Sequence, residues 1–136
     1  MRSRTLGHIG IVLFITLLVT LGMAAIWGAV SLSLRAPGGW MALVIAIDAA
    51  VLLRLAAFPR GRGRATGALV ISLAGMLAGA FTVAALRIGI AFGTAPHEAL
   101  WMIDPRLALT WWELNLTPHD AVALLAALPL AWGLAR

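Results

Sequence analysis

The sequence predicts an all-α, polytopic membrane protein, a bundle of four transmembrane helices that forms one domain over residues 1–136. Of its residues, 62% are hydrophobic and 11% are charged, whereas about a quarter of the residues of an average soluble domain are charged. The mean hydropathy is +1.01. This composition excludes a soluble fold, and the absence of cysteine excludes disulfide scaffolds and cysteine-ligated metal sites.

Four apolar runs define the predicted spans. Ile9–Leu34 contains 26 residues without a charge, Trp40–Phe58 contains 19 with two charges, and Gly67–Phe92 contains 26 with one charge. A helix needs about 20 apolar residues to cross the hydrocarbon core of a bilayer. The fourth run, Pro118–Ala135, is shorter and has Pro129 inside it. We expect the first run to be a mature helix, because the apolar part of a signal peptide has only about 7 to 15 residues.

The distribution of arginine predicts that both ends of the chain are cytoplasmic, because Lys and Arg in short loops are retained on that side of the membrane. The eight arginines outside the spans divide six to two. On one side lie Arg2, Arg4, Arg60, Arg62, Arg64 and Arg136, and on the other lie Arg35 and Arg106. The Arg-, Ala- and Leu-rich composition is typical of a GC-rich bacterial genome, so we expect a multi-pass protein of the bacterial inner membrane.

Residues 93–117, between the third and fourth spans, predict a short helical segment in the plane of the outer interface. Proline stands at three helix starts, as Pro96, Pro105 and Pro118, a position where its missing N–H costs nothing. Tryptophan is enriched at the headgroup level of membranes. Four of the tryptophans are therefore expected to act as interfacial anchors: Trp40, Trp101, Trp111 and Trp112.

Small residues mark one face of the third span. Gly75 and Gly79 stand four positions apart, and Gly89 continues the pattern. Such a face lets another backbone approach closely, which is how helices associate in lipid. It predicts that the third helix lies at the centre of the bundle or, alternatively, that part of this face binds another subunit.

Asp48 lies near the middle of the second span. A carboxylate at that depth costs about 2.5 to 3.5 kcal/mol, so it should face the protein interior and have a partner. From the rise of a helix, Asp48 lies about 12 Å and Arg87 about 7 Å below the outer boundary, a difference that an arginine side chain can span. We therefore expect an intramembrane Asp48–Arg87 pair, either as a structural tie between two helices or as a proton- or cation-coupling site.

Two Pro-His-acid segments predict a possible polar cluster on the outer face, formed by His97, Glu98, His119 and Asp120. Imidazole and carboxylate groups together can bind a metal ion or perform acid–base chemistry. Neither segment has an established ligand spacing, and helix-start chemistry explains proline followed by an acid. We expect no catalytic residue, no bound metal and no cofactor.

The function that these features favour is that of a non-enzymatic accessory or assembly subunit, which contacts lipid and packs against other membrane subunits or a second copy of itself. One alternative is a small proton- or ion-coupled transporter that uses Asp48 and Arg87. Another is a metal-dependent enzyme at the outer face. The arginines are scattered among apolar runs, so the net charge of +5 does not indicate a nucleic-acid partner.

Overall fold

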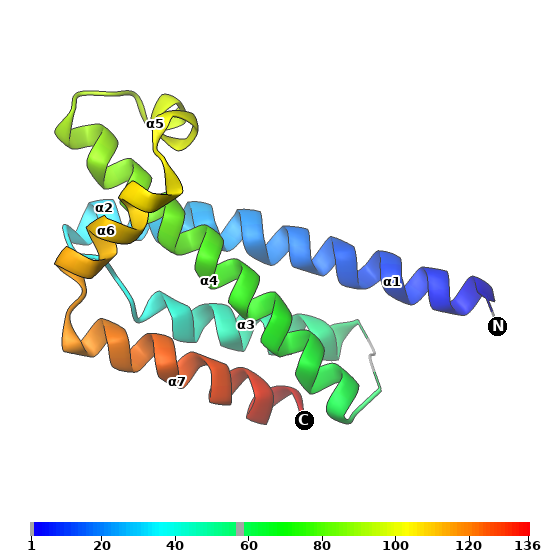
Figure 1. Cartoon of the computed structure of the whole chain (residues 1–136). Helices are drawn as coiled ribbons and strands as arrows, with labels where there is room; N and C mark the ends of the chain where they lie inside the picture. The colour runs from blue at the N-terminus through cyan, green and yellow to red at the C-terminus, as the bar shows by residue number, and fades with distance from the viewer. Residues whose placement is uncertain (1, 57–58) are drawn as a thin grey trace.

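The computed structural model describes residues 2–56 and 59–136, and these residues form helices joined by short turns (Figure 1). In chain order the elements are α1 (Arg2–Leu17), η1 (Leu18–Met23), α2 (Ala24–Leu34), α3 (Met41–Leu55), α4 (Arg62–Ala91), α5 (Pro96–Met102), α6 (Pro105–Asn115) and α7 (Pro118–Ala135). The predicted all-α class is confirmed for the described part of the chain.

The first three elements form one continuous helix over Ser3–Leu34. Its middle section, η1, is a π-helical turn of six residues, a locally widened geometry that occurs frequently at functional sites. The helix ends at Arg35, which adopts a left-handed conformation with φ of 53°. A left-handed residue is a common way to end a helix, although glycine usually fills that position.

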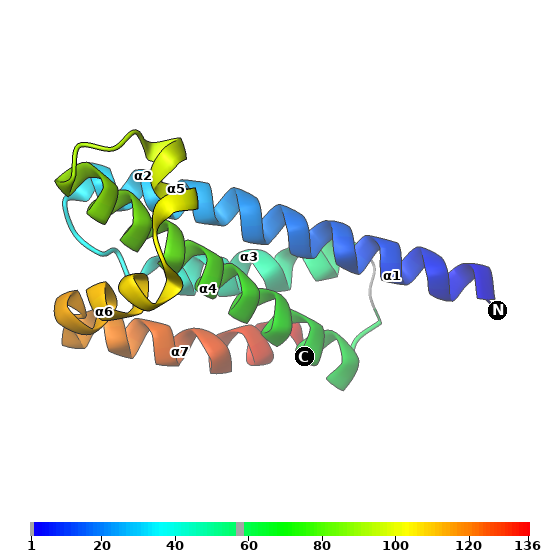
Figure 2. The ribbon, with the colours of Figure 1, turned by 45° about the horizontal axis from the view of Figure 1, so that its top comes forward.

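Helix α4 lies at the centre of the molecule and contacts every other element (Figures 1 and 2). Helices α3 and α7 pack against each other and run in the same direction along α4. We call the end of the bundle where Trp27, Trp112 and Asp120 lie the tryptophan end. The opposite end, where Arg54 and Arg64 lie, is the arginine end.

Three helices of the described chain are long and apolar enough to cross a membrane: Ser3–Leu34, Arg62–Ala91 and Pro118–Ala135. These helices indicate membrane association. The predicted second span corresponds to α3, which has 15 residues and a length of about 22 Å, so it is not among them. Its expected end at Phe58 lies outside the described residues.

The segment between the third and fourth spans forms two helices, α5 and α6, rather than one. Both pack against α4, α5 near its last turns and α6 along its side (Figure 2). Pro96, Pro105 and Pro118 begin α5, α6 and α7 as the sequence predicts. Gly93 adopts a φ of +72° just after α4, a left-handed conformation that glycine adopts without strain and that ends the helix.

Candidate functional site: the Asp48 groove

Arg87 has a different partner from the one that the sequence suggested. Its Nη2 donates a hydrogen bond to the carbonyl oxygen of Ser31 at 2.7 Å, and its Nε lies 3.4 Å from the Ser31 hydroxyl. The Ser31 carbonyl belongs to the last turn of α2, where helical carbonyls have no partner within the helix. The expected Asp48–Arg87 contact is therefore wrong for the described residues: Arg87 reaches the end of α2 and fastens it to α4.

Two further arginines stabilise the end of α7 in the same way. Arg54 Nη2 donates to the Leu134 carbonyl, and Arg64 donates to the Ala135 carbonyl from Nε and to the Arg136 main-chain oxygen from Nη2. A cation at a helix C-terminus also compensates the helix dipole. Arg64 was expected in a loop, but it lies in the first turn of α4 and is buried. Nothing in its local sequence shows that it reaches a carbonyl of α7.

Asp48 lies in the middle of α3 and lines a groove between two helices. The groove has a volume of about 260 Å³ and is lined by Leu18, Gly22 and Met23 of η1, Ile26 of α2, and Asp48 and Leu52 of α3. Asp48 is partly exposed, and no hydrogen bond or ion pair to it is present within residues 2–56 and 59–136. We refer to this feature as the Asp48 groove.

The position of Asp48 differs from that of the other acids, which lie near helix ends. Asp104 accepts a hydrogen bond from the Arg106 N–H at the start of α6, and Asp120 forms a capping box with Thr117 at the start of α7. A carboxylate near a helix N-terminus is stabilised by the helix dipole. Asp48 lies in the middle of a helix and has no such stabilisation.

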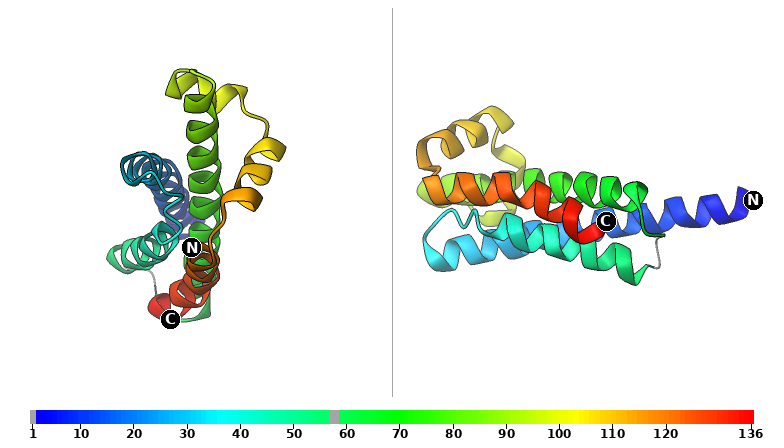
Figure 3. Two further views of the ribbon diagram at one scale, coloured as in Figure 1. Left: turned by 90° about the vertical axis from the view of Figure 1, so that its left-hand side faces the viewer. Right: turned by 90° about the horizontal axis from the view of Figure 1, so that it is seen from below.

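The four residues of the expected outer cluster do not assemble. His97 and Glu98 are exposed on α5, and His119 is exposed on α7, while α5 and α7 lie on opposite sides of α4 (Figures 1 and 3). Asp120 is buried and accepts hydrogen bonds from the Gly39 N–H and the Thr117 hydroxyl. Among the described residues, no group of three His, Asp or Glu side chains could hold a metal ion.

The glycines of α4 make contacts within the chain, in agreement with a central third helix. A Cβ built on Gly75 would lie 2.9 Å from Ile45 Cγ2 of α3, and one built on Gly79 would lie 2.3 Å from the Trp27 ring. A Cβ built on Gly89 would lie 2.4 Å from that of Ala99 in α5. These positions accommodate helices of this chain, so this part of the face is covered.

The tryptophans divide into two groups. Trp40 and Trp101 are exposed, as interfacial anchors would be. Trp112 is buried, donates from Nε1 to the Ala80 carbonyl at 2.7 Å, and meets the Trp27 ring edge-on at a centroid distance of 5.9 Å. Trp111 packs edge-on against Trp112. Trp112 therefore attaches α6 to α4 within the chain, and its role as an interfacial anchor stays a prediction.

No family model, no curated protein and no solved structure matches the chain.

Proposed function

We propose that this protein is an integral membrane protein that acts as a non-enzymatic accessory or assembly subunit of a larger membrane complex. One observation carries the proposal. The first turns of α1 extend well beyond the arginine end of the bundle, so that no other helix lies beside them (Figure 3). These turns expose Leu6 and Ile9, two apolar side chains that a second protein can cover.

The lengths of the helices determine how far this extension reaches. The continuous helix Ser3–Leu34 has 32 residues and is about 48 Å long, whereas α7 has 18 residues and is about 27 Å long. The length of α7 is close to the hydrocarbon thickness of about 30 Å. Since α2 ends and α7 begins at the tryptophan end, the start of α1 extends about 20 Å past the end of α7.

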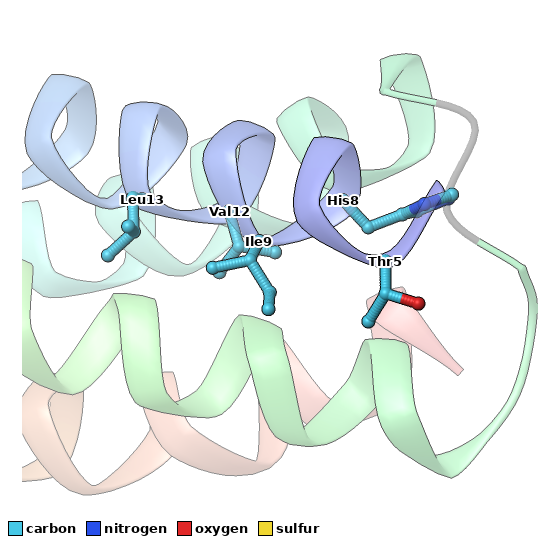
Figure 4. A pocket seen from close by; sticks show the side chains of 5 residues that line it. All are labelled: Thr5, His8, Ile9, Val12 and Leu13. Atoms are coloured by element: carbon cyan, nitrogen blue, oxygen red, sulfur yellow. The ribbon is translucent and has the colours of Figure 1, made fainter. Parts of the chain in front are cut away.

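The extension is exposed, and it carries apolar side chains among polar ones such as Arg4 and Thr5. Residues 3–11 are all exposed, and the exposed fractions are 68% for Leu6, 52% for Ile9 and 66% for Phe14. A shallow pocket of about 250 Å³ lies in this region, and its five lining side chains, labelled in Figure 4, all belong to α1. Exposed apolar side chains beyond the depth that α7 spans support an interaction with another protein, because headgroups and water are poor surroundings for them.

We further propose that α3 is the fourth span and that both ends of the chain are cytoplasmic in a bacterial inner membrane. Gly39, just before α3, is bonded to Asp120 at the start of α7, and Arg54 is bonded to Leu134 near its end. Helix α3 thus runs along most of α7, and α7 is long enough to cross a membrane. The three arginines at residues 59–64, in the turn before α4 and in its first turn, support a cytoplasmic arginine end.

A second candidate function, proton- or cation-coupled transport, is favoured by the unpaired Asp48. The π-helical turn that lines the groove also contains Thr20, whose hydroxyl is buried without a hydrogen-bond partner. An ionisable group within a membrane helix is a candidate element of an ion pathway. A single acid supports this function less well than the α1 extension supports a subunit.

Native mass spectrometry of the protein extracted in a mild detergent from its own membranes tests the proposal. We expect another polypeptide in a fixed ratio to this chain. The double variant Ile9→Ser with Leu13→Ser should lose that polypeptide, because both side chains line the pocket on α1.

The matched control is Val122→Ser with Leu125→Ser, which makes two similar changes on exposed positions of α7. We expect the control to keep the companion polypeptide. Recovery of the native chain alone, or only as a homodimer, would contradict the proposed function.

A further inference from the structure

We propose that the Asp48 groove seats a transmembrane helix of a different protein, and that this helix places one basic side chain against the Asp48 carboxylate. The inference rests on the proposed function, since it identifies the chemistry of one partner of an accessory subunit. Three features of the groove carry it: its outward opening, its charge and its shape.

The groove opens away from the centre of the molecule. Its lining comes from η1, α2 and α3 alone, and the central helix α4 contributes no side chain to it. Leu18 and Ile26, which border it, are each 50% exposed. Asp48 is therefore directed toward the outer surface of the bundle, where a second membrane helix or lipid would meet it.

The charge of Asp48 specifies what the occupant must supply. Asp48 is about 12 Å from the Trp40 end of α3 and about 9 Å from Arg54, which places it near the middle of the bundle. Acidic residues at this depth pair with basic groups or hydrogen-bond donors rather than face lipid. In the described chain no such group is bonded to Asp48, so the occupant is expected to bring a basic side chain.

A second copy of this chain would not supply that group. The arginines within the predicted spans are Arg54 and Arg87. Arg54 is bonded to the Leu134 carbonyl and Arg87 to the Ser31 carbonyl, and both bonds fasten helices of the same chain. A copy could offer either guanidinium only by releasing a helix end, which favours a different protein as the partner.

The shape of the groove suits a helix. Leu18 and Ile26 are about 12 Å apart along η1 and α2, a distance of about two helical turns. Gly22 lies between them, and a Cβ built on it would meet no atom within 4 Å. Small residues at a lipid-exposed position let a second helix approach closely.

Photocrosslinking in native membranes tests the inference on the full chain. A benzophenone amino acid at Ile26 is expected to crosslink to an apolar segment of another protein that contains one Arg, Lys or His. The crosslinked peptide, sequenced by mass spectrometry, identifies that residue. We expect Asp48→Asn to reduce the yield about tenfold, the scale of one interhelical hydrogen bond in a membrane, while Asp48→Glu keeps more of it.

A second variant tests the shape of the groove independently of its charge. Gly22→Leu should fill the groove and abolish the crosslink. The chain itself tolerates the added side chain, because a Cβ built on Gly22 has no atom within 4 Å. Gly133→Leu is the matched control, since Gly133 of α7 also has open space around it. It should leave the crosslink unchanged.

Four results would overturn the inference: no protein crosslink, a crosslink to a second copy of this chain, a partner segment without a basic residue, or a yield that Asp48→Asn does not change. The proposed function is tested separately. If native mass spectrometry finds a companion in fixed ratio while the crosslink is independent of Asp48, the inference fails and the proposed function stands. If no companion is found, the inference and the proposed function both fail.

Discussion

The main-chain N–H of Gly39 donates a hydrogen bond to Asp120 Oδ1 at 2.8 Å, joining residues 81 positions apart in the sequence. The same carboxylate accepts a hydrogen bond from the Thr117 hydroxyl at 2.7 Å through its other oxygen. One buried side chain therefore caps α7 and holds the turn before α3. The contact aligns the beginnings of the parallel helices α3 and α7.

Asp120→Ala is expected to destabilise the protein by about 2 to 4 kcal/mol. The change removes a helix cap, worth about 1 kcal/mol, and leaves the buried Gly39 N–H without a partner, which costs about 1 to 3 kcal/mol. Unfolding in detergent, followed by circular dichroism, measures the effect. Asp104→Ala is the control and should cost only about 1 kcal/mol, because Asp104 caps α6 at an exposed position. Equal losses in the two variants would contradict this account.

Gly79→Ala is expected to destabilise the bundle by about 1 to 3 kcal/mol, the usual cost of overpacking. The new methyl group would lie 2.3 Å from the Trp27 ring, and that ring is held in place because Trp27 Nε1 donates to the Pro37 carbonyl at 2.9 Å. Gly133→Ala, made in open space on α7, should be neutral or stabilise the helix by up to about 1 kcal/mol. Thermal unfolding of both variants provides the comparison, and a neutral Gly79→Ala would be inconsistent with the close contact.

Arg87→Ala is expected to lower the free energy of unfolding by about 1 to 2 kcal/mol, because the Ser31 carbonyl at the end of α2 loses a charged donor. Hydrogen exchange should increase locally in the turn at residues 35–39. Arg106→Ala changes an exposed arginine of α6 and should have little effect on stability or exchange. If Arg87 instead paired with Asp48, Asp48→Asn would reproduce the loss of stability, and we expect that it does not.

Trp112→Phe is expected to cost more than about 1 kcal/mol, since it removes the indole hydrogen bond to the Ala80 carbonyl and leaves part of the buried indole volume unfilled. Trp101→Phe should be nearly neutral, because 90% of the Trp101 side chain is exposed. The two variants also separate the fluorescence of the tryptophans. The fluorescence of each tryptophan is the difference between the native protein and the variant that lacks it. A soluble quencher should reduce the fluorescence of Trp101 more strongly than that of Trp112.

The sequence predicted the helices well because their signals are local. Apolar runs and prolines at helix starts located most elements, and the Thr117–Asp120 capping box follows from a three-residue spacing. The glycine pattern also indicated a central α4 correctly, since small residues show where backbones approach.

The side-chain partners could not be predicted, because they depend on how the helices rotate and tilt. Arg87 and Asp48 differ in depth by no more than an arginine side chain can span, but depth does not specify the direction in which a side chain points around its helix. Helix ends supply unpaired carbonyls, and the arginines bond to those carbonyls. The burial of Trp112 was missed for the same reason, since it depends on α6 lying along the side of α4.

The central claim is that α3 crosses the membrane and completes a four-span bundle, and labelling with a membrane-impermeant maleimide tests it most directly. The chain contains no cysteine, so Arg35→Cys before α3 and Arg60→Cys after it each provide one label site, both at exposed positions. We predict that intact spheroplasts are labelled at position 35 and not at position 60, and that inverted vesicles give the opposite result. Labelling of both positions from the same side would contradict the four-span arrangement.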